Sequence, residues 1–302
     1  MRNRTLLTLA ASIAIAALAA AGAPLAAQDE PYVVTRVAVD LSQPDPDAAY
    51  WQDVPVVHAS LMAQPMIRPR PKEATTTELD VQAVHDGRWL AFRLRWKDEE
   101  RSEAGRLGEY SDAAAIEFPM HPAESPPPIF MGNGSAPVHI FHWRAQYQHD
   151  HEVGKPTMKD LYPNLSIDMY PMEYRDPGTA DPAASAREQY SPGRAVGNPQ
   201  SFPKSGVDEI YAEGFSTSSV QESAAVGHAD WKDGVWTLVI VRPLVREGGS
   251  SFAPGDHTFA AFAIWQGGKG EVGARKCVTM TWTPLALATG KEEAPAPAGG
   301  AS

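Results

Sequence analysis

Two glycine-rich segments of the chain each carry side chains that could bind a metal. The first runs from 126 to 143 and contains Met131. The second runs from 263 to 276 and contains Lys269 and, at its end, Lys276. Glycine lets a backbone approach a flat ligand closely, and a thioether sulfur is a soft ligand for iron. The ordinary alternatives are core packing for a methionine and a solvated surface charge for a lysine.

Cysteine chemistry is almost absent, because Cys277 is the one cysteine in the sequence. A single cysteine excludes an intrachain disulfide framework, a four-cysteine zinc or iron–sulfur site, and covalent haem attachment, which needs two cysteines and a histidine. A redox centre that is bound by several cysteines is therefore excluded. The position of Cys277 beside a strand start is typical of a small core residue.

Histidines offer other possible ligands. His139 and His142 lie three residues apart on an expected strand, so they should point to opposite faces and cannot readily share one metal. In an extended chain, His149 and His151 would lie on one side, which leaves a metal-dependent enzyme open as a hypothesis. A polar surface cluster is the simpler interpretation of these two residues.

The elements that must position these residues are strands. Residues 75–83 and 89–96 alternate between apolar and polar side chains on either side of an Asp86-Gly87 turn, which predicts a β-hairpin. Further strands are expected at 113–118, 138–143, 235–243, 257–265 and 276–282. No long stretch has the period of an amphipathic helix. We therefore expect an all-β protein, an antiparallel β-sandwich with a long irregular insertion and few short helices.

Three segments are expected along the chain. Residues 1–27 resemble a secretory signal peptide, with Arg2 and Arg4 before an apolar run that is too short for a stable membrane span. Residues 28–286 form one β-sandwich domain, in which 146–206 is rich in Pro, Tyr, Asp and Gly and predicts the irregular insertion. Residues 287–302 predict a disordered tail. The expected location is the periplasm.

The composition narrows the class of protein. The chain has 302 residues, of which 43% are hydrophobic and 21% are charged, as in folded proteins. Its net charge of −11 argues against binding to nucleic acid, which needs a cationic surface.

Several motifs together resemble one known family. They are the segment around Trp51, Arg95-Trp96-Lys97-Asp98, Phe130-Met131-Gly132, His142-Trp143-Arg144-Ala145, and Trp265 through Lys276. From about Val33 to Trp282 the chain resembles the haem b-binding γ subunits of the type II dimethyl-sulfoxide-reductase family. That family includes the γ subunits of ethylbenzene dehydrogenase, dimethylsulfide dehydrogenase, and chlorate and selenate reductases.

The resemblance implies a b-type haem, held without covalent bonds at one end of the β-sandwich. Its axial ligands would be Met131 and Lys276, with Lys269 as the rival lysine; Lys276 is preferred because it opens a strand. A lysine ligand must lose its proton, which burial and iron binding both favour. His139 and His142 remain the alternative ligands. Trp143, Arg144 and Arg275 are expected to line the pocket or to meet the haem propionates.

The resemblance further implies an electron-transfer subunit without catalytic residues of its own. Its partners would be an iron–sulfur β subunit, a molybdopterin α subunit and a soluble periplasmic cytochrome c. The alternative is a carbohydrate-binding β-sandwich module without haem, in which Trp89, Trp143 or Trp265 would be stacking platforms for sugars.

Overall fold

The computed structural model describes residues 30–103, 105–122, 125–154, 156, 158–164, 193, 196–197 and 205–290. The expected signal peptide therefore lies outside the described residues. The strands are β1 (Tyr32–Arg36), β2 (Val57–Ser60), β3 (Met62–Ala63), β4 (Glu78–His85), β5 (Trp89–Lys97), β6 (Ala113–Pro119), β7 (Val138–Arg144), β8 (Val207–Ala212), β9 (Ser218–Gln221), β10 (Val226–Lys232), β11 (Val235–Pro243), β12 (His257–Trp265), β13 (Cys277–Val278) and β14 (Thr283–Leu287). The helical elements are the α-helices α1 (Ala145–Glu152) and α2 (Met158–Leu161) and the 3₁₀ turns η1 (Ala49–Asp53) and η3 (Gly267–Lys269).

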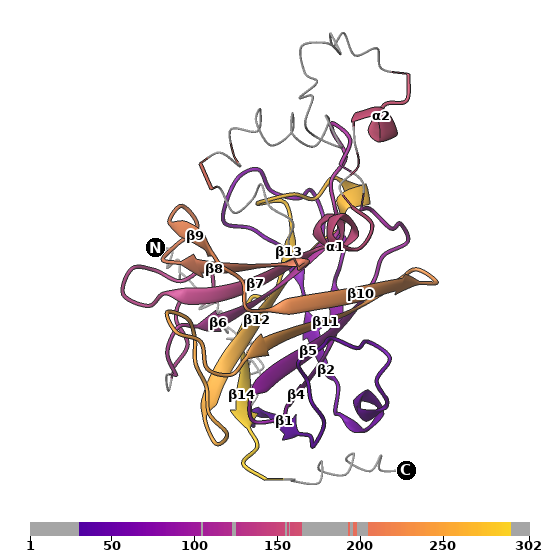
Figure 1. The fold of residues 1–302 in the computed structure, drawn as a ribbon. Coiled ribbons are helices and arrows are strands. Elements are labelled where there is room, and N and C mark those ends of the chain that lie inside the picture. The colour runs from indigo at the N-terminus through magenta and orange to yellow at the C-terminus, as the bar shows by residue number, and fades with distance from the viewer. Residues whose placement is uncertain are drawn as a thin grey trace, which may run out of the picture.

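The described strands form one mixed sheet that folds over on itself into two layers (Figure 1). Its order is β10-β11-β5-β4-β1-β14-β12-β6-β7-β8-β9, with β2 on β4 and with β13 and β3 beside β12. The first layer comprises β2, β4, β5, β10 and β11; the second comprises β3, β6 to β9, β12 and β13. Strands β1 and β14 join the two layers. Strand β1 pairs in parallel with β4 of the first layer and with β14, and β14 pairs with β12 of the second layer. The expected mainly-β sandwich is confirmed.

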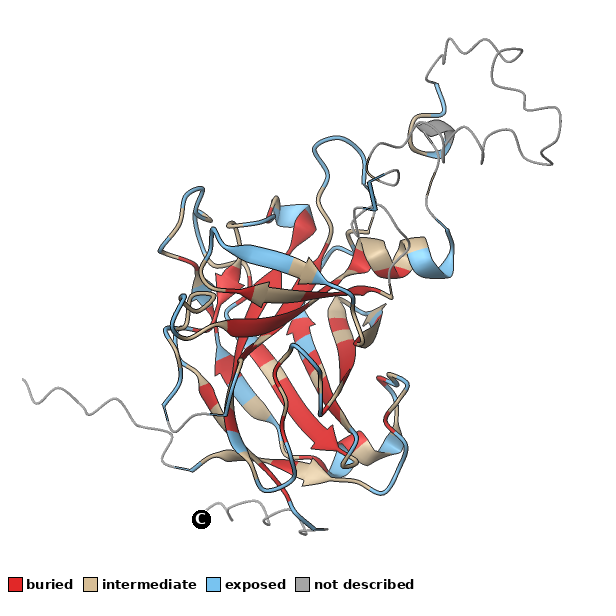
Figure 2. Ribbon diagram, turned by 60° about the vertical axis from the view of Figure 1, so that its left-hand side comes forward, coloured by how far each residue is buried: buried red, intermediate tan, exposed pale blue. Residues whose placement is uncertain are grey.

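The core lies between the two layers because each strand alternates its side chains (Figure 2). The inward residues of β4 and β5 meet those of β6, β7 and β12 in one cluster. Across the interface, the ring centroids of Phe92 and Phe118 are 5.5 Å apart, and those of Trp96 and Trp143 are 6.3 Å apart. The predicted hairpin is confirmed: β4 pairs with β5 in antiparallel register, and Gly87 between them has a positive φ of 95°.

The C-terminal strand pattern differs from the prediction. The expected strand at 276–282 is only two residues long, as β13, and β12 obtains its second antiparallel partner from β14. Strand β14 ends at Leu287, and Ala288 after it is buried, so the ordered chain continues past the predicted boundary at 286. Residues 291–302 lie outside the described residues.

The segment after β7 also differs from the prediction, because helix α1 covers Ala145–Glu152 at the start of the expected irregular insertion. His149 and His151 therefore lie on a helix, not on an extended chain. Most of 165–204 lies outside the described residues. Among the helices that are described, none is long and apolar enough to cross a membrane.

Asp98 and Asp112 form a buried carboxylate pair close to η3, at the start of β6. Asp112 accepts hydrogen bonds from the backbone N–H of Ser102 and of Gly267 and from the indole N–H of Trp236, at 2.7, 2.8 and 3.1 Å. Asp98 is also buried, and its pKa is raised to about 7 by burial and by the charge of Asp112. Burial raises the pKa of Asp112 as well.

These raised pKa values predict how stability depends on pH. Above pH ~4, the ordinary pKa of an aspartate, the unfolded chain has released protons that the folded pair still holds. The free energy of unfolding should therefore fall as the pH rises from about 4 towards 7. Asp98→Asn should flatten this slope, because an amide cannot ionise, whereas Asp53→Asn at an exposed position should not. Urea unfolding across this pH range measures the free energy of unfolding. Equal slopes of that free energy against pH in the wild type and in Asp98→Asn would contradict a raised pKa for Asp98.

Candidate functional site

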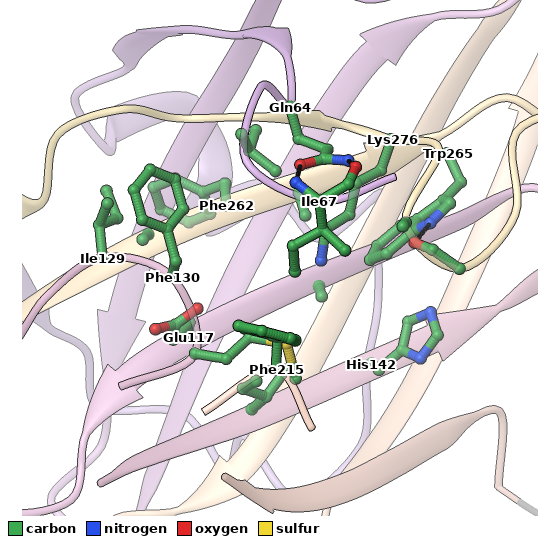
Figure 3. Close-up of a pocket in the computed structure, with 18 of the residues that line it drawn as sticks. Gln64, Ile67, Glu117, Ile129, Phe130, His142, Phe215, Phe262, Trp265 and Lys276 are labelled. Carbon is green, nitrogen blue, oxygen red and sulfur yellow. Dashed lines mark hydrogen bonds between the residues drawn. The ribbon is translucent and has the colours of Figure 1, made fainter. Parts of the chain in front are cut away.

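A cavity of about 450 Å³ lies on the outer face of the second layer, away from the core (Figure 3). This volume is within the range of roughly 300–1,000 Å³ that is usual for cofactor sites. Outward-facing residues of β6, β7 and β12 form its floor, and loops around Gln64, Phe130, Phe215 and Ala274 form its walls. Most of its lining is apolar.

Small side chains create the space. Ala115 on β6 pairs with Ala263 on β12, and Ala261 on β12 pairs with Glu117 on β6. All four residues line the cavity. Large side chains such as Ile116 and Phe262 point into the core, and the alanines that alternate with them point outward. The outer face of the sheet therefore has little side-chain bulk at the floor of the cavity. A flat ligand could therefore lie close to the sheet.

Met131 lines this cavity, as the resemblance implies. It has a positive φ of 62°, which is uncommon for a side chain other than glycine, asparagine or aspartate. Gly132 follows with a φ of 65°, and a Cβ there would lie 2.6 Å from the carbonyl oxygen of Ala136. The loop is closed by two backbone hydrogen bonds between Asn133 and Ala136. This fixed turn directs the thioether of Met131 to the cavity wall.

Lys276 lines the same cavity from a neighbouring element, just before β13. Its carbonyl oxygen accepts a hydrogen bond from the backbone N–H of Gln64 at 3.0 Å. Its amine lies 4.8 Å from the centroid of the Trp265 ring, and Trp265 is itself held by a 2.9 Å hydrogen bond to the carbonyl of Gly273. Burial lowers the pKa of the Lys276 amine. Loss of the proton is therefore easier than in a solvated lysine, although the charge of Glu117 opposes the shift.

Glu117 is the carboxylate of the cavity, and it was not among the residues predicted for the site. Burial raises its pKa, while the charge of Lys276 and a backbone hydrogen bond from Met131 oppose the shift. Its Oε1 atom is buried and has no hydrogen-bond partner among the described residues. A buried oxygen without a partner is expected where a ligand occupies the cavity in the functional protein.

His142 and Arg144 line the cavity at its β7 side. The rings of His142 and Trp265 are 4.8 Å apart at an angle of 37°. The guanidinium of Arg144 donates to the hydroxyl of Tyr147 at 2.9 Å and lies 3.8 Å from a carboxylate oxygen of Asp208. Arg144 thus provides a positive charge at the cavity, suited to a carboxylate of the ligand.

The other predicted site residues lie elsewhere. Trp143 is completely buried in the core, because its place on β7 points it inward, and its indole donates to Gln148 at 3.0 Å. Arg275 stacks on Tyr110, with its guanidinium carbon 5.5 Å from the ring centroid, and does not line the cavity. Lys269 is exposed on η3, outside the cavity. The expected contacts of Trp143 and Arg275 with the cavity are therefore corrected.

His139 and His142 point to opposite faces of β7, as their spacing predicts. His139 points inward, where its Nε2 lies 3.0 Å from Glu209, and only His142 reaches the cavity. Within the described part of the chain, no three His, Cys, Asp or Glu side chains form a metal-binding group, and His149 and His151 lie on α1.

The tryptophan positions bear on the sugar-binding alternative. A stacking platform for a sugar needs an exposed ring face. Trp143 is 0% exposed and Trp265 is 7% exposed. Two of the three predicted platforms are therefore not available at the surface.

Comparison with known proteins gives one family match. The family model described as "Ethylbenzene dehydrogenase" matches residues 48–277. A Haloferax mediterranei protein, named as a respiratory nitrate reductase heme subunit, ORF7, is 25% identical over 239 residues, which cover 78% of this chain and 65% of that protein. The chain thus spans slightly less than two thirds of that relative. The dimethylsulfide dehydrogenase subunit gamma of Rhodovulum sulfidophilum is 26% identical over 247 residues, which cover 79% of this chain and 73% of that protein.

Among solved structures, the chain resembles a family 9 carbohydrate-binding module from Caldicellulosiruptor kristjanssonii in complex with cellotriose. The TM-score is 0.39 at 6% identity, and the alignment covers 90% of this chain and 100% of the module.

Proposed function

The chain belongs to the ethylbenzene dehydrogenase family, and on that premise we propose that it is an electron-transfer subunit that holds one b-type haem in the cavity of the second layer. The observation that carries the proposal is that Met131 and Lys276, 145 positions apart in the sequence, line one apolar cavity. A thioether and a neutral amine can both bind haem iron. The sequence motifs and the lining of the cavity support this proposal.

The residues of the cavity fit a haem in three respects. The alanine floor leaves room for a flat macrocycle, the aromatic ring of Phe130 and the apolar side chain of Ile67 provide apolar walls, and Arg144 offers a cation for a propionate. When bound, the haem would supply one-electron exchange. The side chains of Met131 and Lys276 would hold it, and the apolar walls would keep water from the metal.

The same proposal places the chain in a complex. The haem would exchange electrons with an iron–sulfur β subunit, which connects to a molybdopterin α subunit, and with a soluble cytochrome c in the periplasm. The relative from Rhodovulum sulfidophilum is named as a subunit, which supports a role in an assembly. The net charge of −11 would favour a basic carrier, because complementary charges raise the rate of encounter.

Two experiments test this role. Protein purified from the periplasm of cells supplied with haem should show the sharp bands of a reduced b-type haem after dithionite is added. Acidified acetone should then extract the haem, since no cysteine pair binds it covalently. Reduced protein mixed with oxidised cytochrome c should transfer its electron faster at low than at high ionic strength. A colourless protein would count against the haem site. Failure to transfer electrons to any basic carrier would count against exchange with a cytochrome c.

The alanine floor gives a further prediction. Ala115→Phe should place a ring in the cavity, because Ala115 points away from the core, and should lower haem occupancy at least tenfold. The fold should persist, because the substituted side chain does not enter the packed interior. Ala115→Ser, which is only slightly larger, should retain haem. Haem content per protein, alongside the circular dichroism of both variants, checks this. Full haem occupancy in Ala115→Phe would show that the haem lies elsewhere.

A further inference from the structure

The placement of Glu117 is unusual for a carboxylate. It lies on β6 between the core residues Ile116 and Phe118, and its side chain points to the opposite face. Its strand partners there are Ala261 and Ile140, which both line the cavity. A carboxylate among apolar neighbours costs free energy unless it has partners. Its contacts should therefore explain why it is there.

One contact of Glu117 is with the Met131 loop. Glu117 and Met131 line the same cavity, and the backbone N–H of Met131 lowers the pKa of the carboxyl. Met131 has the left-handed φ of 62°, a conformation that the surroundings must hold in a residue of this size. An interaction of the carboxylate with this N–H would tie Met131 to the rigid strand β6. The direction in which the thioether leaves the loop would then depend on β6 as well as on the turn at Asn133.

The second neighbour is Lys276, which Glu117 faces across the cavity (Figure 3). The buried Oε1 atom of Glu117 has no hydrogen-bond partner among the described residues. An amine that binds a metal through its lone pair keeps N–H groups that need acceptors. The other charged or titratable side chains of the cavity, His142 and Arg144, lie on β7 beside Trp265 and Tyr147. Glu117 is thus the carboxylate of the cavity that could accept a hydrogen bond from the amine of Lys276.

We propose that Glu117 is a positioning residue for both axial side chains: it anchors the backbone of Met131 and offers Lys276 the acceptor that orients its amine. The inference rests on the proposed haem site and goes beyond it, because one residue outside both ligand loops would couple them. Partners behind metal ligands of this kind typically change affinity by roughly 10–100-fold.

The test uses full-length protein produced with haem available and compares Glu117→Ala, Glu117→Gln and Glu78→Ala. Glu78 is the matched control, since it is an exposed strand carboxylate on β4 that does not line the cavity. Three quantities are measured: the near-infrared band of a methionine–ferric iron bond, the reduction potential, and the rate of haem transfer to apomyoglobin. Glu117→Ala should lose the methionine band, shift the potential downwards and release haem at least tenfold faster. Glu117→Gln should keep the methionine band, because its amide oxygen can accept the Met131 N–H.

A wild-type methionine band and release rate in Glu117→Ala would overturn the inference, as would an equal loss in Glu78→Ala. If Glu117→Ala does not fold, Glu117→Asp carries the test: its carboxylate is one methylene shorter and should weaken the band without abolishing folding. An unchanged band in Glu117→Asp would then overturn the inference. Absence of haem from the wild type would instead defeat the proposed function, so the two failures can be told apart.

Discussion

Met131→Ala protein is expected to lose the methionine–iron band completely and to bind haem at least 100-fold more weakly than the wild type. The thioether lines the cavity from a turn that is closed by backbone hydrogen bonds and fixed by a glycine that tolerates no Cβ. Alanine keeps the turn but removes the sulfur. Loss of a ligand should exceed the roughly 10–100-fold effect of losing a partner behind it. The reduction potential should also fall, because methionine raises it.

The matched control for this variant is Met66→Ala. Met66 lines the same cavity, but it lies on the 64–67 loop and is 57% exposed. It should keep both the band and the affinity. Absorption spectra from the visible to the near infrared, with a haem titration of each apoprotein, measure the two effects. Equal behaviour of the two variants would show that Met131 is not an iron ligand.

Lys276→Arg is expected to lose the nitrogen ligand while retaining a long cationic side chain. The lysine can bind iron only as a neutral amine, and burial lowers its pKa in that direction. A guanidinium stays protonated at any accessible pH and cannot replace it. We expect a change from six-coordinate low-spin to high-spin ferric haem and at least tenfold weaker haem binding.

Lys269→Arg is the matched control, since this lysine of the same glycine-rich segment is exposed on η3. Its spectrum should equal that of the wild type. Electron paramagnetic resonance of the ferric proteins separates low-spin from high-spin iron. A low-spin signal that survives in Lys276→Arg and disappears in Lys269→Arg would reverse the assignment of the two lysines.

Strand alternation explains why much of the fold could be predicted. The residues of β4 and β5 alternate clearly around Gly87, so both the hairpin and its buried face followed from the sequence. Strands β8, β9 and β10 did not follow from it, because β8 buries two carboxylates, β9 is short and mostly exposed, and β10 mixes apolar and polar residues. Pairing partners such as β14 for β12 depend on the whole sheet, and no local pattern specifies them.

The same alternation explains which of the expected strand residues reach the cavity. Motifs placed Met131 and Lys276 near a common ligand, and both line one cavity. Trp143 was expected there because it adjoins His142, but neighbours on a strand face opposite sides, so only one of them can reach the cavity. Glu117 was missed although Ala113-Ala114-Ala115-Ile116-Glu117 carries a signal. Small residues on one face of a strand, followed by a carboxylate on that same face, indicate a hollow with a polar wall.

In the proposed site, Met131 and Lys276 would hold one haem iron between them. Near-infrared magnetic circular dichroism of the ferric wild-type protein is the sharpest test of this ligand pair, because the energy of the charge-transfer band depends on which nitrogen ligand accompanies a methionine. We predict a low-spin band at the energy of a methionine–amine pair. A band at the energy of a methionine–imidazole or bis-imidazole pair would contradict the claim and would point to His142.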